Sequence, residues 1–194
     1  RLSDEKFPCI FATKAFERQS LLACFANDPT LPAAKRRVTN AVVEYLNFIR
    51  LLPVEDAVWS TLVILFEPQK SETVFKMHSH IKSDVKEESD VNNEKYHDQA
   101  WNLLQYLHDN DPQPWPAHIP TDPNDAMWSF CFDGEPLFVN ISTPAHTDRV
   151  SRNLGDGLAL IIQPRPNFDR VAGLHSPGGK EVREHIRQRM QAYD

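Results

Sequence analysis

The chain is poor in cysteine and glycine and contains no long hydrophobic segment. Its 194 residues include three cysteines, none of them in a CxxC pair, and six glycines. An odd number of unpaired cysteines argues against a disulfide framework and indicates a reducing, cytoplasmic setting. The few glycines form neither a Walker A nor a Rossmann pattern. Because no apolar run approaches the roughly 20 residues that span a bilayer, we expect no membrane partner.

The chain has no excess of positive charge, since 27 Asp and Glu outnumber 21 Lys and Arg and give a net charge of −6. Nucleic-acid binding needs clustered positive charge that displaces counterions from phosphates, so we expect no nucleic-acid partner. The composition is typical of a globular protein, and the length of 194 residues suits one compact domain. The sequence begins at Arg1, so we expect it to start inside a longer one, and nothing in it resembles a signal peptide.

Hydrophobic periodicity predicts the main elements. Apolar positions at spacings of three and four predict amphipathic helices in residues 31–52, 94–108 and 179–193. Short apolar runs predict strands in residues 21–28, where the strand ends in an Asn-Asp-Pro turn, and in residues 60–68 and 157–165. The polar run at residues 82–93 predicts a mobile excursion, and the proline-rich residues 111–125 predict an extended strap anchored by Trp115.

The clearest local pattern is WSFCFDGEPLFVNIS, residues 128–142. Two β-rich runs are joined by Asp133-Gly134, a dipeptide that accepts the positive φ of a tight turn, which predicts an antiparallel hairpin. No regular helical crossover separates the predicted strands. We therefore expect an α+β fold, with a largely antiparallel sheet flanked by helices, in a single domain spanning residues 1–194.

A histidine follows this hairpin where its second strand ends. In FVNISTPAHTDRVSRNLG, residues 138–155, His146 precedes Arg149 and Arg152, and a helical turn would put all three side chains on one side. A neutral imidazole can ligate a metal, and the planar arginine fork suits carboxylates. One histidine with two arginines therefore fits an iron porphyrin with its two propionates.

An alternative interpretation of this segment needs no ligand. His146 would then cap a loop, and the arginines would pair with Asp148, Asp156 or Asp169. Arg165, at the end of the next predicted strand, could add a third positive group to the rim around His146, or it could pair with Asp169.

Other side chains offer different ligands. Cys9, in FPCIF, could ligate haem iron as a thiolate in place of the histidine, although its apolar neighbours favour a buried, inert thiol. His78 and His80 form HSH, and a strand would put both side chains on one face. With His97 or His108 they could form a non-haem metal site, which would imply a different class of enzyme.

Hydrolase signatures such as GxSxG and HExxH do not occur. Three tryptophans, Trp101, Trp115 and Trp128, could line a cofactor pocket, although aromatic side chains at such positions are also typical of a hydrophobic core.

Six blocks of the sequence together resemble the YqcI/YcgG family. They are FPCIF (7–11), WNLLQYLHDNDPQPWP (101–116), WSFCFDGEPLFV (128–139), STPAHTDRVSRNLG (142–155), IIQPRPNFD (161–169) and IRQRMQAYD (186–194). Because the blocks occur in order along nearly the whole chain, the resemblance is much more specific than any one motif.

The resemblance implies an activity, because some members of that family are haem-dependent N-oxygenases. It implies haem b as the cofactor and hydroxylation of a guanidine or amine nitrogen in a small substrate such as arginine. Dioxygen or peroxide and an unidentified electron donor would be the other partners, and a homodimer is an open alternative. His146 would be the proximal iron ligand and Arg149 and Arg152 the propionate partners. A haem-binding or haem-sensing protein without catalysis would keep the same ligands.

Overall fold

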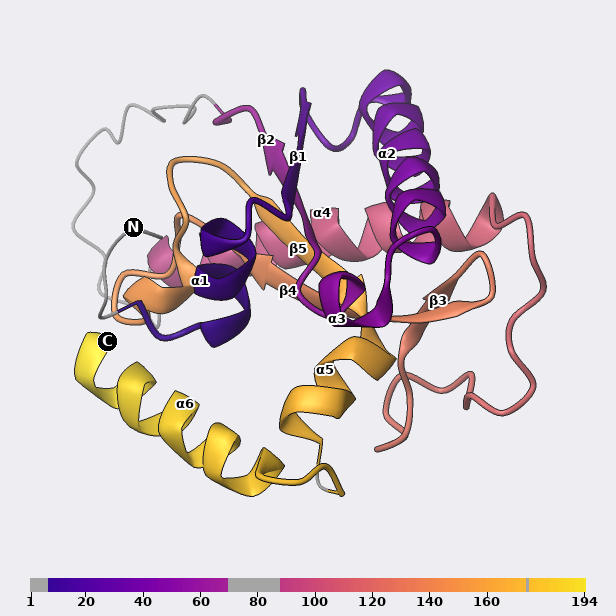
Figure 1. The fold of residues 1–194 in the computed structure, drawn as a ribbon. Helices are drawn as coiled ribbons and strands as arrows, with labels where there is room; N and C mark the ends of the chain where they lie inside the picture. The colour runs from indigo at the N-terminus through magenta and orange to yellow at the C-terminus, as the bar shows by residue number, and fades with distance from the viewer. Residues whose placement is uncertain (1–6, 70–87, 174) are drawn as a thin grey trace.

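The computed structural model describes residues 7–69, 88–173 and 175–194 (Figure 1). The strands are β1 (Leu21–Ala26), β2 (Thr61–Phe66), β3 (Phe130–Phe132), β4 (Glu135–Ser142) and β5 (Ala159–Pro164). The helices are α1 (Ile10–Glu17), α2 (Pro32–Arg50), α3 (Val54–Ala57), α4 (Glu88–Asp109), α5 (Arg165–Ala172) and α6 (Gly179–Tyr193), with a 3-10 turn η1 (Val150–Arg152). No helix in these ranges is long and apolar enough to cross a membrane.

The five strands form one sheet in the order β1-β2-β5-β4-β3. Only β1 and β2 run parallel, and the other three neighbouring pairs are antiparallel. The predicted hairpin is confirmed: β3 and β4 pair across a turn in which Asp133 and Gly134 have φ values of 53° and 73°. These observations confirm the α+β class with a largely antiparallel sheet.

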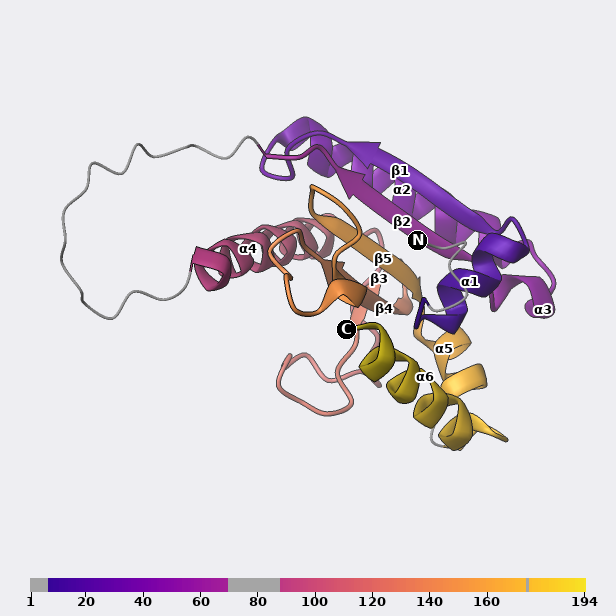
Figure 2. The same ribbon diagram turned by 90° about the vertical axis from the view of Figure 1, so that its left-hand side faces the viewer.

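Helices cover both faces of the sheet (Figures 1 and 2). On one face, α2 and α4 meet the apolar strand residues in the main core, which includes Val38, Leu46, Leu62, Ile64, Leu103, Leu107, Leu160 and Ile162. On the other face, Phe168 of α5 stacks on Phe138 of β4 at 5.1 Å between ring centroids and on Phe11 of α1 at 5.2 Å. Burial of such side chains contributes roughly 1.5 to 3 kcal/mol each, so both layers stabilise the sheet.

Two of the predicted helices lie where the periodicity indicates them. α6 spans the predicted residues 179–193, and α2 ends just before Pro53, which has no N–H to continue a helix. α4 differs, because it begins at Glu88 and not at residue 94. Residues 88–93 of the predicted mobile excursion are therefore helical, and the rest of that excursion lies outside the described residues. Once packing has fixed the later turns of a helix, extending it by one residue needs little free energy, so polar residues can extend it.

Candidate functional site

A short closed loop follows β4 and carries His146. The backbone N–H of Thr143 donates to the carbonyl of Arg152 at 3.0 Å, which closes the loop. Inside it, the side-chain amide of Asn153 donates to the carbonyls of Pro144 and His146, each at 3.3 Å. The position of His146 is therefore fixed by backbone and side-chain hydrogen bonds, as a ligand residue requires.

The surroundings of His146 favour its neutral form. Burial lowers the pKa of His146 below its usual value, and the positive charges of Arg152, His97 and Arg149 lower it further. Asp194 is the opposing influence, since its carboxylate favours the charged imidazole. A neutral imidazole keeps a nitrogen lone pair, which is the form that ligates metals.

Arg149 and Arg152 lie close to this imidazole but pair with no carboxylate among the described residues. One guanidinium nitrogen of Arg152 donates to the side-chain oxygen of Asn140 on β4, at 3.2 Å. Burial and the charge of Arg149 lower the pKa of Arg152, whereas the carboxylate of Asp194, which accepts hydrogen bonds from the N–H and hydroxyl of Ser151, raises it. The loop thus gathers like charges around a histidine. Among the described residues, neither arginine forms an ion pair with Asp148, Asp156 or Asp169, and the carboxylate that acts on Arg152 is that of Asp194.

His97, on α4, lies beside His146. The two ring centroids are 6.3 Å apart and the ring planes are inclined by 79°. The Nε2 atom of His97 is buried and has no hydrogen-bond partner in the described parts of the chain. Sequence reasoning named His97 only as a companion of His78 and His80, which lie outside the described residues. Residues 7–69, 88–173 and 175–194 contain no group of three or more His, Cys, Asp or Glu side chains that could hold a metal ion.

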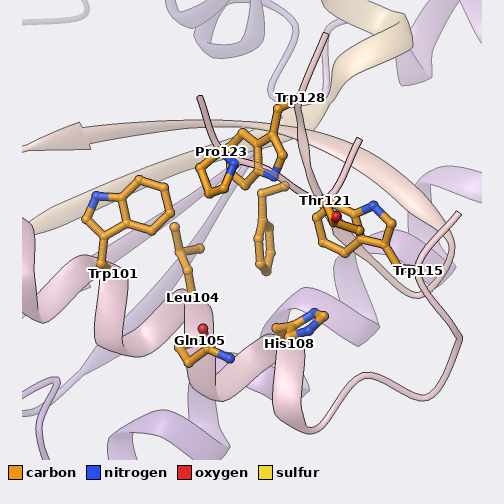
Figure 3. Close-up of a pocket in the computed structure, with 9 residues that line it drawn as sticks. Trp101, Leu104, Gln105, His108, Trp115, Thr121, Pro123 and Trp128 are labelled. Carbon is orange, nitrogen blue, oxygen red and sulfur yellow. The ribbon is translucent and has the colours of Figure 1, made fainter. Parts of the chain in front are cut away.

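An aromatic cavity of about 190 Å³ opens further along the same helix. Figure 3 shows residues of α4 on one side and residues of the proline-rich strap and of the segment before β3 on the other. It is lined by Trp101, Leu104, Gln105, His108, Trp115, Thr121, Pro123, Trp128 and Phe130. Trp128 contacts both other indoles, with ring centroids 5.9 Å from Trp101 and 6.4 Å from Trp115. The three tryptophans therefore line one cavity, and the strap does use Trp115 as an anchor, because its Nε1 donates to the carbonyl of Ile119 at 2.9 Å.

A second cavity, of about 170 Å³, shares Trp101, Trp128 and two further wall residues with the first. It reaches β4, which contributes residues 137–139 and Ile141 to its wall, and Ser129 and Arg165 add polar groups. β3 pairs only with residues 135–137 of β4, so the described part of the chain adds no strand at the rest of that edge. The two cavities adjoin at these shared residues, and we call them together the groove between α4 and β4.

The groove begins one helical turn from the histidine pair. His97, Trp101, Leu104 and His108 follow at intervals of three or four residues, so they share one face of α4. Four residues advance a helix by about 6 Å, which is the step from His97 to Trp101. This interval is the sequence signal that could have identified His97 as a site residue.

Arg165 does not join the rim around His146. In the antiparallel pair, Ser142 of β4 lies opposite Ala159, whereas Pro164 lies opposite Leu137. At about 3.3 Å per residue, the start of α5 is therefore roughly 17 Å from the end of β4 that leads to His146. The expectation was wrong because successive antiparallel strands end at opposite edges of a sheet. Arg165 instead binds Asp169, with its Nε 3.1 Å from the carboxylate, and lines the second cavity.

The cysteines are free thiols in buried surroundings. Cys9 precedes α1, where burial raises the pKa of its thiol. Burial and nearby carboxylates raise the pKa of Cys131 to about 11. A protonated thiol is a poor metal ligand, so this environment disfavours Cys9 as a ligand.

Comparison with known proteins identifies relatives along the whole chain. The Streptomyces lavendulae protein DcsA, named for a proposed Nω-hydroxy-L-arginine synthase activity, is 36% identical over 197 residues, covering 100% of this chain and 66% of that protein. YqcI and YcgG of Bacillus subtilis, both uncharacterised, are 31% and 32% identical, each covering 98% of this chain and 67% of the relative.

The chain thus spans about two thirds of the length of these curated relatives. No solved structure matches it significantly. The model of the YqcI/YcgG family matches residues 1–194, so this chain belongs to the YqcI/YcgG family.

Proposed function

We propose that this chain hydroxylates a guanidine nitrogen of arginine or a related small guanidino compound, with haem b as its cofactor. The observation that carries the proposal is the loop that places Arg149 and Arg152 beside His146, whose pKa they lower, with Asp194 as the opposing carboxylate. Clustered like charges are unfavourable by themselves, so this arrangement suits a bound anion. The name of the relative DcsA supports arginine as the substrate class.

The residues present fit haem by the chemistry of their donor atoms. His146 would hold the iron, because burial and its cationic neighbours keep its imidazole neutral. Arg149 and Arg152 would bind the propionates, since guanidinium forks form charge-assisted bonds with carboxylates. The groove between α4 and β4 offers apolar walls next to this polar end.

Bound haem would supply the oxygen chemistry that protein side chains lack. The chain itself would orient the cofactor, exclude water along the tryptophan-lined groove and bind the substrate. A guanidinium cation is attracted to the faces of indole rings, and the net charge of −6 also favours a cationic substrate. Dioxygen with an external electron donor, or peroxide, would supply the oxygen atom.

The first experiment is an absorption spectrum of protein produced with a haem precursor. We expect a Soret band, and after reduction a carbon-monoxide band at the position typical of imidazole ligation. His146→Ala should abolish or strongly shift these bands, whereas His185→Ala, at an exposed position on α6, should not. A thiolate-type band would reassign the ligand to Cys9, and failure to bind haem under any loading condition would overturn the cofactor.

Turnover separates an enzyme from a haem-binding or haem-sensing protein. The loaded protein should convert arginine or another guanidino compound into an N-hydroxy product when peroxide or a reductant with dioxygen is supplied. Haem binding without any such product, tested across guanidines and amines, would favour a sensing role. Stoichiometric iron or zinc without porphyrin would instead revive the non-haem site at His78 and His80.

A further inference from the structure

The larger cavity combines aromatic walls with solvent access. Its volume is about 190 Å³, and its lining includes three indoles and no Asp, Glu, Lys or Arg side chain. Figure 3 shows Trp101 on one side and Trp115 on the other, with Trp128 between them. Trp101 is 45% exposed, although large aromatic side chains are usually well buried. Exposed apolar side chains that gather around a cavity mark a binding site, whereas single ones have no such meaning.

The segment that forms this cavity is strongly acidic. Residues 96–148 contain no Lys or Arg and eight Asp or Glu, which are Asp98, Asp109, Asp111, Asp122, Asp125, Asp133, Glu135 and Asp148. Arg50 of α2 pairs with Asp133, and Lys35 of α2 lies over the ring of Tyr106, but neither cation lines the cavity. Charge of one sign around a cleft attracts small ligands of the opposite sign. This cavity therefore favours a cation.

Indole rings and one amide supply the contacts that a planar cation needs. The negative face of an indole ring attracts a guanidinium group. Gln105 also lines the cavity, and its Nε2 donates to the carboxylate of Asp109 at 2.8 Å. This bond fixes the amide and leaves its carbonyl oxygen able to accept from an N–H group of a ligand.

The same surroundings disfavour a carboxylate. A carboxylate in this cavity would meet no arginine or lysine on its lining, and the acidic segment around it would repel the charge. A cavity holds one water molecule once about 10 to 15 Å³ are accessible to it, so 190 Å³ has room for a guanidinium group and an alkyl chain. The ligand that fits has a cationic head and an uncharged tail.

We propose that the larger cavity binds an alkylguanidine that carries no carboxylate, in preference to arginine. The inference rests on the proposed function in taking this guanidine to be the substrate, whereas the binding itself needs no cofactor. It leaves the smaller cavity, whose wall reaches Ile141 just before the loop that carries His146, for the cofactor.

Titration calorimetry of the full chain without haem tests this site, with butylguanidinium as the probe. We expect butylguanidinium to bind about tenfold or more tightly than arginine, since like charges brought together in a site are unfavourable. Trp101→Leu should weaken butylguanidinium binding about tenfold, through the lost cation–π contact. Gln105→Leu should weaken it about threefold to tenfold, through the lost hydrogen bond. Trp59→Phe alters an indole on the other face of the sheet and should bind like the unaltered protein.

A charge variant that keeps the local hydrogen bonds tests the acidic surroundings. Asp122 and Asp125 accept backbone N–H bonds from Asn124 and Met127, and asparagine at both positions keeps an oxygen for each bond. Asp122→Asn with Asp125→Asn should therefore weaken butylguanidinium binding and reduce its salt dependence without lowering the melting temperature.

Two results would overturn the inference. Equal affinities for arginine and butylguanidinium would contradict the preference, and unchanged binding in both Trp101→Leu and Gln105→Leu would contradict the site. Absence of butylguanidinium binding to the unaltered protein has the same meaning. If such a protein still binds haem and hydroxylates arginine, the proposed function stands, and if the chain binds butylguanidinium but no haem, only the proposed cofactor fails.

Discussion

Two neighbouring regions along α4 have opposite chemistry. The groove around Trp101 and Trp128 is aromatic and apolar, and no charged side chain lines its larger cavity. The loop that carries His146 is polar and holds two arginines, with Asp194 as the carboxylate that acts on Arg152. A ligand that satisfies both regions has an apolar body and an anionic edge, which is the chemistry of a porphyrin with propionates. The difference teaches that neither region alone identifies the ligand.

The largest effect should come from removing the central indole of the apolar region. Trp128 is half-buried and contacts the rings of both Trp101 and Trp115. Trp128→Ala should lower the free energy of unfolding by about 2 to 3 kcal/mol, because it leaves an unfilled space between those rings. Denaturant unfolding measures the loss, and haem affinity should fall without a change in its salt dependence. A variant of unchanged stability would contradict the packing described for this groove.

Removing the positive charges of Arg149 and Arg152 should weaken haem binding and leave the free energy of unfolding unchanged. Arg149→Gln with Arg152→Gln should weaken haem binding about a hundredfold or more, because each of the two charge-assisted bonds to a carboxylate contributes roughly 1.5 to 3 kcal/mol. The remaining affinity should lose most of its salt dependence. Arg170→Gln, on an exposed position of α5, is the control and should bind haem normally. If the double variant binds haem as tightly as the unaltered protein, these arginines do not bind the cofactor.

Acid should destabilise the protein through His146. The pKa of this imidazole lies below 6.5 in the folded chain, so between 6.5 and that lower value the unfolded chain binds more protons. The free energy of unfolding should therefore fall as the pH falls through this window, with no further contribution from this group below it. Comparing denaturant unfolding of the unaltered protein and His146→Gln between pH 7.5 and pH 5 checks this. An identical pH dependence in the two proteins would rule out the effect.

The smallest effect should come from removing the carboxylate that pairs with Arg165 at the surface. Arg165 and Asp169 form an ion pair one helical turn apart, and both side chains are more than one third exposed. Asp169→Asn should change the free energy of unfolding by no more than about 0.5 kcal/mol, since such surface pairs are weak. A loss of more than about 1 kcal/mol in the free energy of unfolding would show that the ion pair of Arg165 and Asp169 is not a weak surface pair.

Much of the fold was predictable because its strongest patterns are local. The helical periodicity before Pro53, the charged helix at the C-terminus and the Asp133-Gly134 turn all depend on neighbours within a few residues. The sequence does not predict α5, because Pro164 and Pro166 are also typical of the end of a strand. Proline also suits the first turn of a helix, where its missing N–H leaves no bond unmade, and Pro166 lies there.

The site was less predictable because it depends on contacts between distant segments. His146, Arg149 and Arg152 are close in sequence, so their grouping could be anticipated. His97 comes from another element, and only the fold brings it to His146. The misplacement of Arg165 has the same origin, because strand order and direction decide which strand ends meet.

The distribution of tryptophans gives the protein an internal fluorescent reporter. Three of its four tryptophans line one cavity, while Trp59 lies on the other face of the sheet, with its ring 5.9 Å from Phe11. Intrinsic emission should therefore arise mainly from the groove, where a bound porphyrin would quench it by energy transfer. Trp59→Phe would remove most of the remaining background emission and leave a chain whose fluorescence follows the groove alone.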